Sequence, residues 1–474
     1  AQESRGLGDV YKRQLWMSAT EEKDVRFSPY KLPSDKMKEP PTTFMGRLKY
    51  IGPGIIVTAS IVGSGELIAT TALGAQAGFV TLWTIILSCA LKIILQLEMA
   101  KMSITTGKPM LAFWNTMPGP RLLMGWAVWA WLIMLIAKFI QFGGIIGSTS
   151  QSIELAIPGF SINLGSILIA ISVVLLLATG KYKRIEKVST VLVVLFVIFT
   201  IGMAILTLFT KYAYSWADIL NGLTFKMPPE AAFAAIGAFG ITGIGGDEIV
   251  QYTYWCVEKG YAANTGPCDE SEAWYRRAKG WFRVMYMDAT IAMVIYTLAT
   301  LAFYILGAAV LHGQGKIPGG MTLIKTLSTM YTEVLGGKWV VYFFAIGAFA
   351  TLYSTLISWT AANQRIVADI MARMNLIDFE NERQVNRVIF WSGIILPAIY
   401  TLMSIVWKAP AFMVQIGGWG TAFILLVIIY SSFYHRYKIL DPKLKPSTFY
   451  DVYLVVGSIA ILGVVAYTVW QLVK

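Results

Sequence analysis

The chain has 474 residues, of which 56% are hydrophobic and 14% charged, and its mean hydropathy is +0.61. The apolar residues form runs of roughly 20, the length that crosses a hydrocarbon core about 30 Å thick. This composition excludes a soluble domain and indicates a polytopic α-helical membrane protein. Lys and Arg in cytoplasmic loops and near lipid headgroups explain the formal net charge of +12 without a nucleic-acid partner.

The amino end differs in character from the rest of the chain. The string from Ser4 to Gln14 resembles translated sequencing-adapter read-through and lacks the apolar core of a signal peptide. We therefore interpret residues 1–16 as a sequence artefact and Met17 as the expected start. Residues 17–44 are polar and contain proline, which predicts a disordered cytoplasmic tail.

Eleven apolar segments follow, at about 50–75, 80–104, 122–146, 162–179, 187–209, 231–257, 286–311, 338–361, 388–406, 411–432 and 451–471. With the amino end inside the cell, twenty Lys and Arg fall in inside loops and six in outside loops. The positive-inside rule therefore predicts a multi-pass protein of the cell membrane with a cytoplasmic amino end.

Glycines interrupt two of these segments, and an acid follows each interruption. The first segment contains Gly63-Ser64-Gly65 followed by Glu66. The sixth contains Gly243-Ile244-Gly245-Gly246 followed by Asp247 and Glu248. Interruptions near mid-membrane in segments five apart are typical of a five-plus-five inverted repeat, whose interrupted helices face each other and hold the transport site.

The buried acids are the first candidate ligands. Glu66 lies about fifteen residues into its segment, near mid-bilayer at 1.5 Å per residue. An acid at that depth is costly and marks a functional site by default; the structural alternative is a protonated or hydroxyl-bound carboxyl. Asp247 and Glu248 either face the same site or are first-turn acids stabilised by a helix dipole.

Other polar residues lie deep in the apolar segments. Gln415, before the glycines of the tenth segment, is a candidate cation ligand, with an interhelical hydrogen bond as the alternative. Lys92 and Lys138 require a carboxylate partner or must snorkel. Asp288 is expected to form an interfacial ion pair.

The sequence contains no motif for enzymatic chemistry. The three cysteines, Cys89, Cys256 and Cys268, show no pairing or metal-ligand spacing, and the only histidines are His312 and His435. We expect reduced thiols, no cofactor and no catalytic site.

A resemblance to the NRAMP divalent-metal transporters rests mainly on the first segment. The matching residues there are Gly52-Pro53-Gly54, Gly63-Ser64-Gly65-Glu66, Ala69-Thr70 and Gly74-Ala75-Gln76-Ala77-Gly78-Phe79. Fainter support comes from Thr105-Thr106-Gly107-Lys108 and from Met287-Asp288-Ala289-Thr290. The resemblance implies an all-α LeuT-type transport domain over 45–435, so that 436–474 would supply a cytoplasmic loop and an additional helix.

The chain departs from the family's metal-binding pattern. The family's Asp-Pro-Gly-Asn motif falls on Gly63-Ser64-Gly65-Glu66, and its Met-Pro-His falls near Ile244-Gly245-Gly246. The third-segment acids of the family's proton path fall on Gln141 and Gly144. A thioether favours transition metals, so the oxygen ligands that remain suit a harder ion such as Mg²⁺, which retains several waters.

These departures resemble the NRAMP-related magnesium transporters. We predict transport of Mg²⁺, and of Mn²⁺ as a second substrate, by a monomer without proton coupling. The predicted ligands are Glu66, Gly63, Ser64, Asp247, Gly243, Gln415 and Glu248. The alternatives are a proton-coupled Mn²⁺ or Fe²⁺ transporter and a LeuT-type transporter of an amino acid or amine. The amino-acid or amine substrate is the strongest rival, but an acid cluster without a basic partner in the sequence points more to a bare or hydrated cation.

Overall fold

The computed structural model of the chain describes residues 37–178, 182–379 and 381–474, without the side chains of Ser64 and residues 182–189. The expected artefact at 1–16 and most of the expected tail lie outside these ranges. Residues 37–44 of the predicted disordered tail lie within them, and Lys38 contacts the helices that follow the sixth segment. The Lys38 amide donates to the Asn264 carbonyl at 3.0 Å, and Trp281 Nε1 donates to the Lys38 carbonyl at 3.1 Å.

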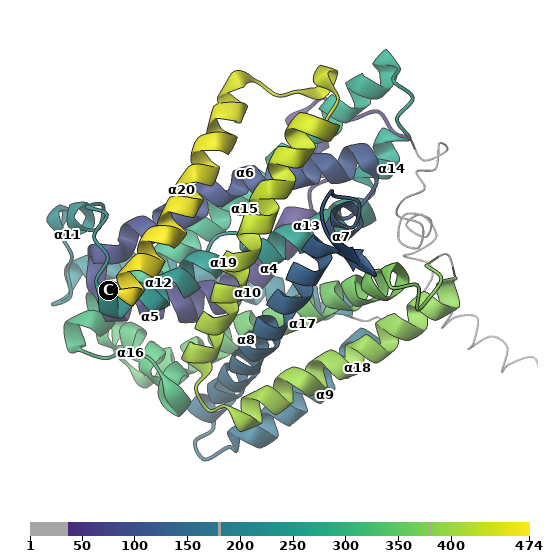
Figure 1. Cartoon of the computed structure of the whole chain (residues 1–474). Helices are drawn as coiled ribbons and strands as arrows, with labels where there is room; N and C mark the ends of the chain where they lie inside the picture. Colours follow the sequence, from purple (N-terminus) through teal and green to yellow (C-terminus); the bar gives the residue numbers. More distant parts are fainter. Residues whose placement is uncertain (1–36, 179–181, 380) are drawn as a thin grey trace, which may run out of the picture.

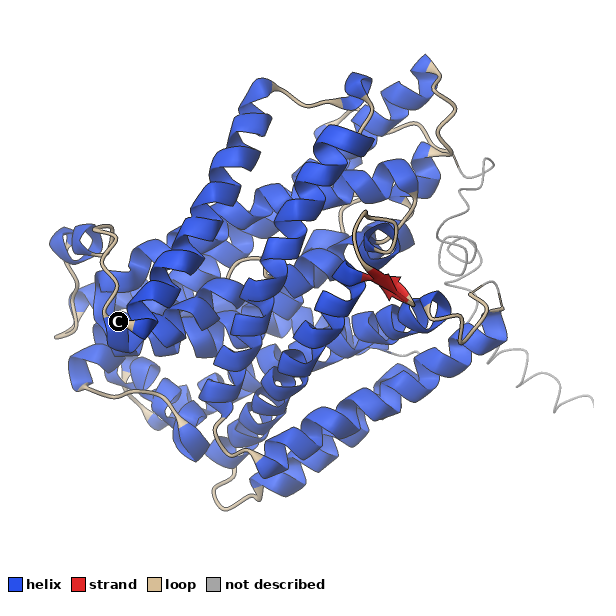
Figure 2. Cartoon of the chain, in the orientation of Figure 1, coloured by secondary structure: helices blue, strands red, loops and turns tan. Residues whose placement is uncertain are grey.

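The described chain is built almost entirely of helices (Figures 1 and 2). The first group is α3 (Phe44–Leu48), α4 (Pro53–Ile61), η2 (Val62–Thr70), α5 (Thr71–Ala77), η3 (Gly78–Thr81), α6 (Leu82–Thr106), α7 (Met110–Trp114), α8 (Trp126–Ala156) and α9 (Ile162–Ala178). The second is α10 (Tyr182–Leu206), η4 (Thr207–Phe209), α11 (Trp216–Asn221), α12 (Pro229–Ile241), α13 (Gly246–Glu258), α14 (Tyr261–Thr265) and α15 (Glu272–Leu306). The last is η5 (Gly307–Leu311), η6 (His312–Gln314), η7 (Gly320–Thr322), α16 (Leu323–Leu335), α17 (Lys338–Arg373), α18 (Glu382–Val406), α19 (Pro410–Tyr434), η8 (His435–Ile439), η9 (Pro442–Leu444) and α20 (Thr448–Val473). One short antiparallel pair, β1 (Arg121–Leu122) and β2 (Met124–Gly125), precedes α8 with Arg121 opposite Gly125.

The helices account for all eleven predicted segments. Nine helical stretches of the described chain are long and apolar enough to cross a membrane. One of them, Pro53–Thr106, contains the first two segments, joined through the 3-10 turn η3. The fourth segment corresponds to the shorter apolar helix Ile162–Ala178. The predicted all-α membrane architecture is therefore confirmed.

The two interruptions take different forms. In the sixth segment α12 ends at Ile241 and α13 begins at Gly246, and between them Gly243 has φ of +65°, which favours glycine. The first segment is not unwound: η2 is a nine-residue π-helical stretch between α4 and α5. The Thr70 hydroxyl donates to the Gly65 carbonyl at 2.9 Å, so this carbonyl of the wider turn has a partner within the segment.

The interrupted segments lie at the centre of the bundle. The stretch η2 contacts α12, α15 and α17, while α13 contacts α4 and α6. At the periphery, α9 and α18 lie side by side, and α20 lies along one edge (Figure 1). These outer helices expose large apolar side chains such as Ile171, Ile395 and Ile459, as expected of lipid-facing surfaces.

Asp288 fixes the start of the first segment. It is buried in α15 and accepts hydrogen bonds from the backbone amides of Gly52 at 2.8 Å and Gly54 at 2.7 Å, and from the Tyr252 hydroxyl at 2.9 Å. The expectation of an interfacial ion pair is wrong, because both carboxylate oxygens cap the amino end of α4. A carboxylate there satisfies free amides and interacts favourably with the helix dipole.

The substitution Asp288→Asn should therefore destabilise the protein. The amide keeps one acceptor but loses the charge, and its NH₂ group cannot accept from a backbone amide. Charge-assisted hydrogen bonds contribute about 1.5–3 kcal/mol each, so we expect a lower midpoint of thermal unfolding in detergent. Asp269→Asn, in an exposed loop, is the control. Equal midpoints for the two variants would contradict the capping role.

Candidate functional site

Glu66 lies in the middle of η2 with no exposed surface. Its Oε1 accepts hydrogen bonds from the Gly243 amide at 3.3 Å and from the Thr300 hydroxyl at 3.0 Å. Its Oε2 has no hydrogen-bond partner among the described side chains and backbone groups. The structure thus brings the acid of the first segment to the break in the sixth, with one oxygen free to bind a ligand.

The glycines beside Glu66 allow close helix packing. A Cβ on Gly63 would overlap the side chain of Thr355 on α17, and one on Gly65 would lie 3.1 Å from the Ile241 carbonyl oxygen. Their role in the structure is therefore to let η2 approach α17 and the end of α12. The side chain of Ser64, a predicted ligand, lies outside the described part of the structure.

The break in the sixth segment also lies against α6. A Cβ on Gly243 would come within 3.0 Å of the Cys89 Cα and 3.3 Å of its Sγ. Sequence reasoning gave this thiol no part in the site. The structure places it beside the residue whose amide contacts Glu66, and it is a free, buried thiol.

Asp247, in the first turn of α13, is fully buried and paired with Lys138 of α8. The distance from Lys138 Nζ to Asp247 Oδ2 is 3.2 Å, and Trp359 Nε1 donates to the same oxygen at 2.8 Å. The indole of Trp359 stacks on Phe142 with ring centroids 4.0 Å apart. The carboxylate partner expected for Lys138 is thus Asp247, and this pair joins α8 to the second half of the broken segment.

Glu248 folds back over the amino end of its own helix. A Cβ on Gly245 would overlap Glu248 Oε2, and Glu248 Oε1 lies 3.9 Å from Lys138 Nζ. The side chain is 8% exposed. This position over free helical amides agrees with the first-turn alternative considered for this acid.

Gln415, on α19, lies beside α12 and away from the break. It is half-buried, and a Cβ on Gly237 would lie 3.1 Å from its Cβ. Gly237 precedes the end of α12 by four residues. The residue of α19 that lies beside the break is instead Thr421, whose methyl group is 2.9 Å from where a Cβ on Gly245 would be.

The predicted ligands do not all converge in this conformation. Among the described residues, no group of three or more His, Cys, Asp and Glu side chains is arranged to hold a metal ion. Glu66 and Asp247 have no exposed surface. The arrangement is a closed one, in which Glu66 and the break form one cluster and Asp247 with Lys138 forms a neighbouring pair.

Lys92 is the site residue whose role sequence reasoning missed. It has neither a carboxylate partner nor an exposed head group: its ammonium contacts the carbonyls that end α12. The available signal was the spacing of Ser88, Lys92 and Gln96, which places three polar residues on one face of α6. All three are buried. Such a polar stripe in an apolar helix indicates a polar partner at the same depth.

A second buried polar cluster lies away from the break, where α6, η8 and α20 meet. Glu98 contacts Lys101 and pairs with His435 Nδ1 at 2.7 Å, and the Tyr450 hydroxyl donates to it at 2.8 Å. Arg436 pairs with Asp451 through two contacts of 2.6 Å. These contacts fix the last helix against α6 and involve none of the predicted ligands.

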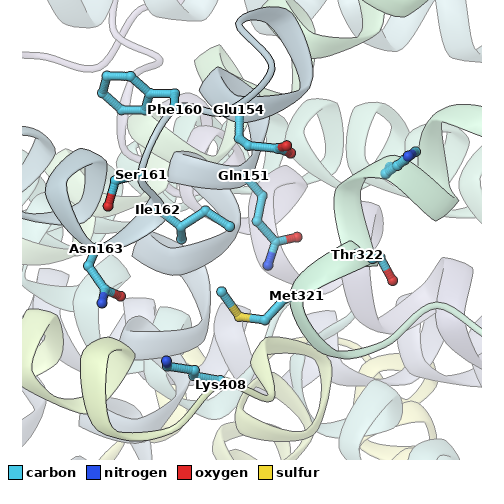
Figure 3. Close-up of a pocket in the computed structure, with 11 residues that line it drawn as sticks. Gln151, Glu154, Phe160, Ser161, Ile162, Asn163, Met321, Thr322 and Lys408 are labelled. Carbon is cyan, nitrogen blue, oxygen red and sulfur yellow. The ribbon is translucent and has the colours of Figure 1, made fainter.

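A cavity of about 450 Å³ opens at the carboxyl end of α8 (Figure 3). Its lining carries charges of both signs, since it includes Glu154, Lys325 and Lys408 among polar and apolar residues. Gln151 joins its walls by accepting from the Ile324 amide at 3.1 Å. No predicted ligand lines this cavity.

Comparison with known proteins gives one consistent result. A family model described as natural resistance-associated macrophage protein-like matches residues 54–471. A protein of Xanthomonas campestris named divalent metal cation transporter MntH is 27% identical over 332 residues, which cover 69% of this chain and 70% of that one. A Brucella suis protein of the same name is 23% identical over 328 residues, covering 68% and 67% of the two chains.

Solved structures agree on the fold. The manganese transporter of Eremococcus coleocola, bound to an aromatic bis-isothiourea compound, aligns with a TM-score of 0.53 at 16% identity over 93% of this chain and 98% of its own. MhsT in complex with L-phenylalanine aligns with a TM-score of 0.55 at 14% identity over 92% of this chain and 100% of its own. The expected LeuT-type fold is confirmed, and at these identities the likeness concerns the fold alone.

The Lys138–Asp247 pair can be tested by removing one partner or both charges. Lys138→Met leaves a buried carboxylate without its counter-charge, which costs about 3–5 kcal/mol. We expect a large fall in the midpoint of thermal unfolding. The double variant Lys138→Met, Asp247→Asn should recover most of that loss. A double variant no more stable than Lys138→Met would contradict the pairing.

Proposed function

The chain belongs to the natural resistance-associated macrophage protein-like (Nramp) family, and on that premise we propose that it transports divalent metal cations across the cell membrane. The proposal rests on the environment of the Glu66 carboxylate. This carboxylate is buried in an apolar bundle, contacts the break of the sixth segment, and keeps one oxygen without a hydrogen-bond partner among the groups described. An acid held in this way is well suited to bind a cation at the centre of a transporter.

We further propose Mg²⁺ as the preferred substrate, with Mn²⁺ second. All the candidate ligands offer hard oxygen donors. These are the carboxylates of Glu66, Asp247 and Glu248, the amide of Gln415, the hydroxyl of Ser64 and the backbone carbonyls of Gly63 and Gly243. Hard ligands of this type suit Mg²⁺, which retains part of its water shell. Asp247 and Gln415 would have to approach Glu66 in an open conformation, or act through such waters.

We propose that transport is not coupled to protons. Gln141, at a third-segment position where the family has an acid, carries no charge. Its side chain packs against Gly417, since a Cβ on that glycine would lie 2.7 Å or less from it. His435 is engaged by Glu98. His312 bonds the Ala75 carbonyl at the far end of the first segment, so no histidine of the described chain lies at the break. A proton route through the break would have no histidine carrier.

One observation favours a second candidate, the transport of softer transition metals. The thiol of Cys89 lies beside Gly243, the residue whose amide contacts Glu66. A thiolate is a soft ligand that favours such metals over Mg²⁺. The metal site would then combine one thiolate with the carboxylate of Glu66.

An amino-acid substrate is less well supported, although for a different reason from the one given by the sequence. Two basic side chains, Lys92 and Lys138, do lie near the break. Lys138 is paired with Asp247, and Lys92 is bound to backbone carbonyls. Neither ammonium is available to receive a substrate carboxylate in this arrangement.

The proposed orientation places the amino end in the cytoplasm. The cavity lined by Lys325 and Lys408 would then open on the outer face, where it could admit a hydrated ion. We propose a monomer as the functional unit.

Proteoliposomes containing the purified protein provide the test. With a membrane potential imposed, we expect Mg²⁺ uptake that changes by less than about twofold when a pH gradient is added, because charge movement alone drives it. Mn²⁺ should compete with Mg²⁺. Cd²⁺ should be no stronger a competitor than Mn²⁺, and Cys89→Ser should not change this order.

The second candidate predicts a different set of results. Cd²⁺ would then inhibit strongly, and Cys89→Ser would remove most of that inhibition. Strict dependence on protons together with no Mg²⁺ flux would contradict the proposal.

A further inference from the structure

The carbonyl end of α12 is an unusual surface to bury in a membrane protein. The last carbonyls of a helix have no partner within it, and they carry the negative end of the helix dipole. Here that end lies at the centre of the bundle, next to Gly243 and Glu66. Carbonyl groups gathered at such a point normally bind a cation.

Lys92 supplies that cation from within the chain. Its Nζ donates to the carbonyls of Phe239 at 2.7 Å, Gly240 at 3.4 Å and Thr242 at 2.6 Å. The ammonium also lies 5.4 Å from the centroid of the Phe239 ring. The side chain has no exposed surface. The head group is therefore bound as an ion would be, by oxygens at the end of a broken helix.

The neighbouring groups complete this arrangement. The Ser88 hydroxyl, one turn before Lys92, lies 2.9 Å from both the carbonyl and the hydroxyl oxygens of Thr242. On the other side of the break, the Gly243 amide donates to Glu66. None of the ion pairs between described side chains joins Lys92 to a carboxylate. Ammonium and carboxylate thus bind the two sides of one break without binding each other.

We propose that Lys92 is a tethered cation that determines the selectivity of the transport site. By occupying the carbonyl end of α12, it denies these oxygens to monovalent ions. By placing a positive charge across the break from Glu66, it also weakens the binding of every metal ion there. This inference rests on the proposed transport function and adds to it the residue that sets which cations bind, and how tightly.

The physical consequence follows from Coulomb's law. A unit charge within several ångströms of a divalent ion in a protein interior opposes its binding by an energy worth about tenfold or more in affinity. Weak binding is useful in a transporter, because an ion must also leave the site. Without the ammonium, the freed carbonyls and Glu66 together would attract cations more strongly and with less discrimination.

A purely structural cap is the competing explanation, and neutral and charged donors at position 92 separate the two. Lys92→Gln removes the charge and leaves at most two donors for the three carbonyls, so at least one carbonyl is freed, whereas Lys92→Arg keeps the charge and enough donors. Lys226→Gln, in an exposed loop, is a matched control for the loss of one lysine charge. Each purified variant would be titrated calorimetrically with Mn²⁺ and with Mg²⁺.

We expect Lys92→Gln to bind both metals about tenfold more tightly than the wild type or Lys226→Gln. Lys92→Arg should stay within about threefold of the wild type. About 150 mM NaCl, replacing choline chloride at equal ionic strength, should weaken Mn²⁺ binding to Lys92→Gln only. A Lys92→Gln variant with wild-type affinity and no response to Na⁺ would overturn the proposal and leave Lys92 as a cap.

The wild type supplies a test that does not depend on the folding of any variant. With the carbonyls occupied by Lys92, replacing choline by Na⁺ or K⁺ at about 150 mM should change its Mn²⁺ affinity by less than about twofold. Clear competition by either ion would overturn the proposal even if the variants failed to fold. A wild type that binds neither Mn²⁺ nor Mg²⁺ would instead overturn the proposed function, and this inference with it.

Discussion

A helix that is interrupted inside a membrane frees backbone groups that lipid cannot satisfy, and the centre of this protein is organised by how those groups are bound. The carbonyls at the end of α12 are bound by Lys92, and the Gly243 amide is bound by Glu66. The amides at the start of α4 are bound by Asp288. Two of these three charged residues come from helices other than the interrupted pair. Through these contacts, α6 packs against the break of the sixth segment and α15 packs against the start of the first.

The same constraint shapes the proposed site. Near the break lie three carboxylates and two ammonium groups, and each ammonium already has partners. Lys138 neutralises Asp247 and approaches Glu248, while Lys92 is held by carbonyls. Glu66 is left as the carboxylate of this group without an ammonium partner among the described residues, and an incoming cation would complete its environment. The sequence suggested that none of these acids has a basic partner. Among the three, this holds for Glu66 but not for Asp247 and Glu248, which lie near Lys138.

Much of the fold could be predicted from the sequence, because long apolar runs and glycine breaks are one-dimensional signals. They predicted the eleven segments and both interruptions. The form of the first interruption could not be predicted, since a glycine pair permits either an unwound segment or the π-helix that Thr70 stabilises. Hydrogen-bond partners on different helices could not be predicted either. Asp288 lies 236 residues from Gly52, and only packing reveals that it is a helix cap rather than half of an ion pair.

The proposed transport depends most on Glu66 as the carboxylate that binds the transported ion. The most direct test is Mg²⁺ uptake into proteoliposomes by Glu66→Gln, with Glu230→Gln, an exposed acid in the first turn of α12, as the matched control. We predict that Glu66→Gln reduces uptake by about a hundredfold, since a charged ligand to a divalent ion is lost, and that Glu230→Gln stays within about twofold of the wild type. Wild-type uptake by folded Glu66→Gln would contradict the account.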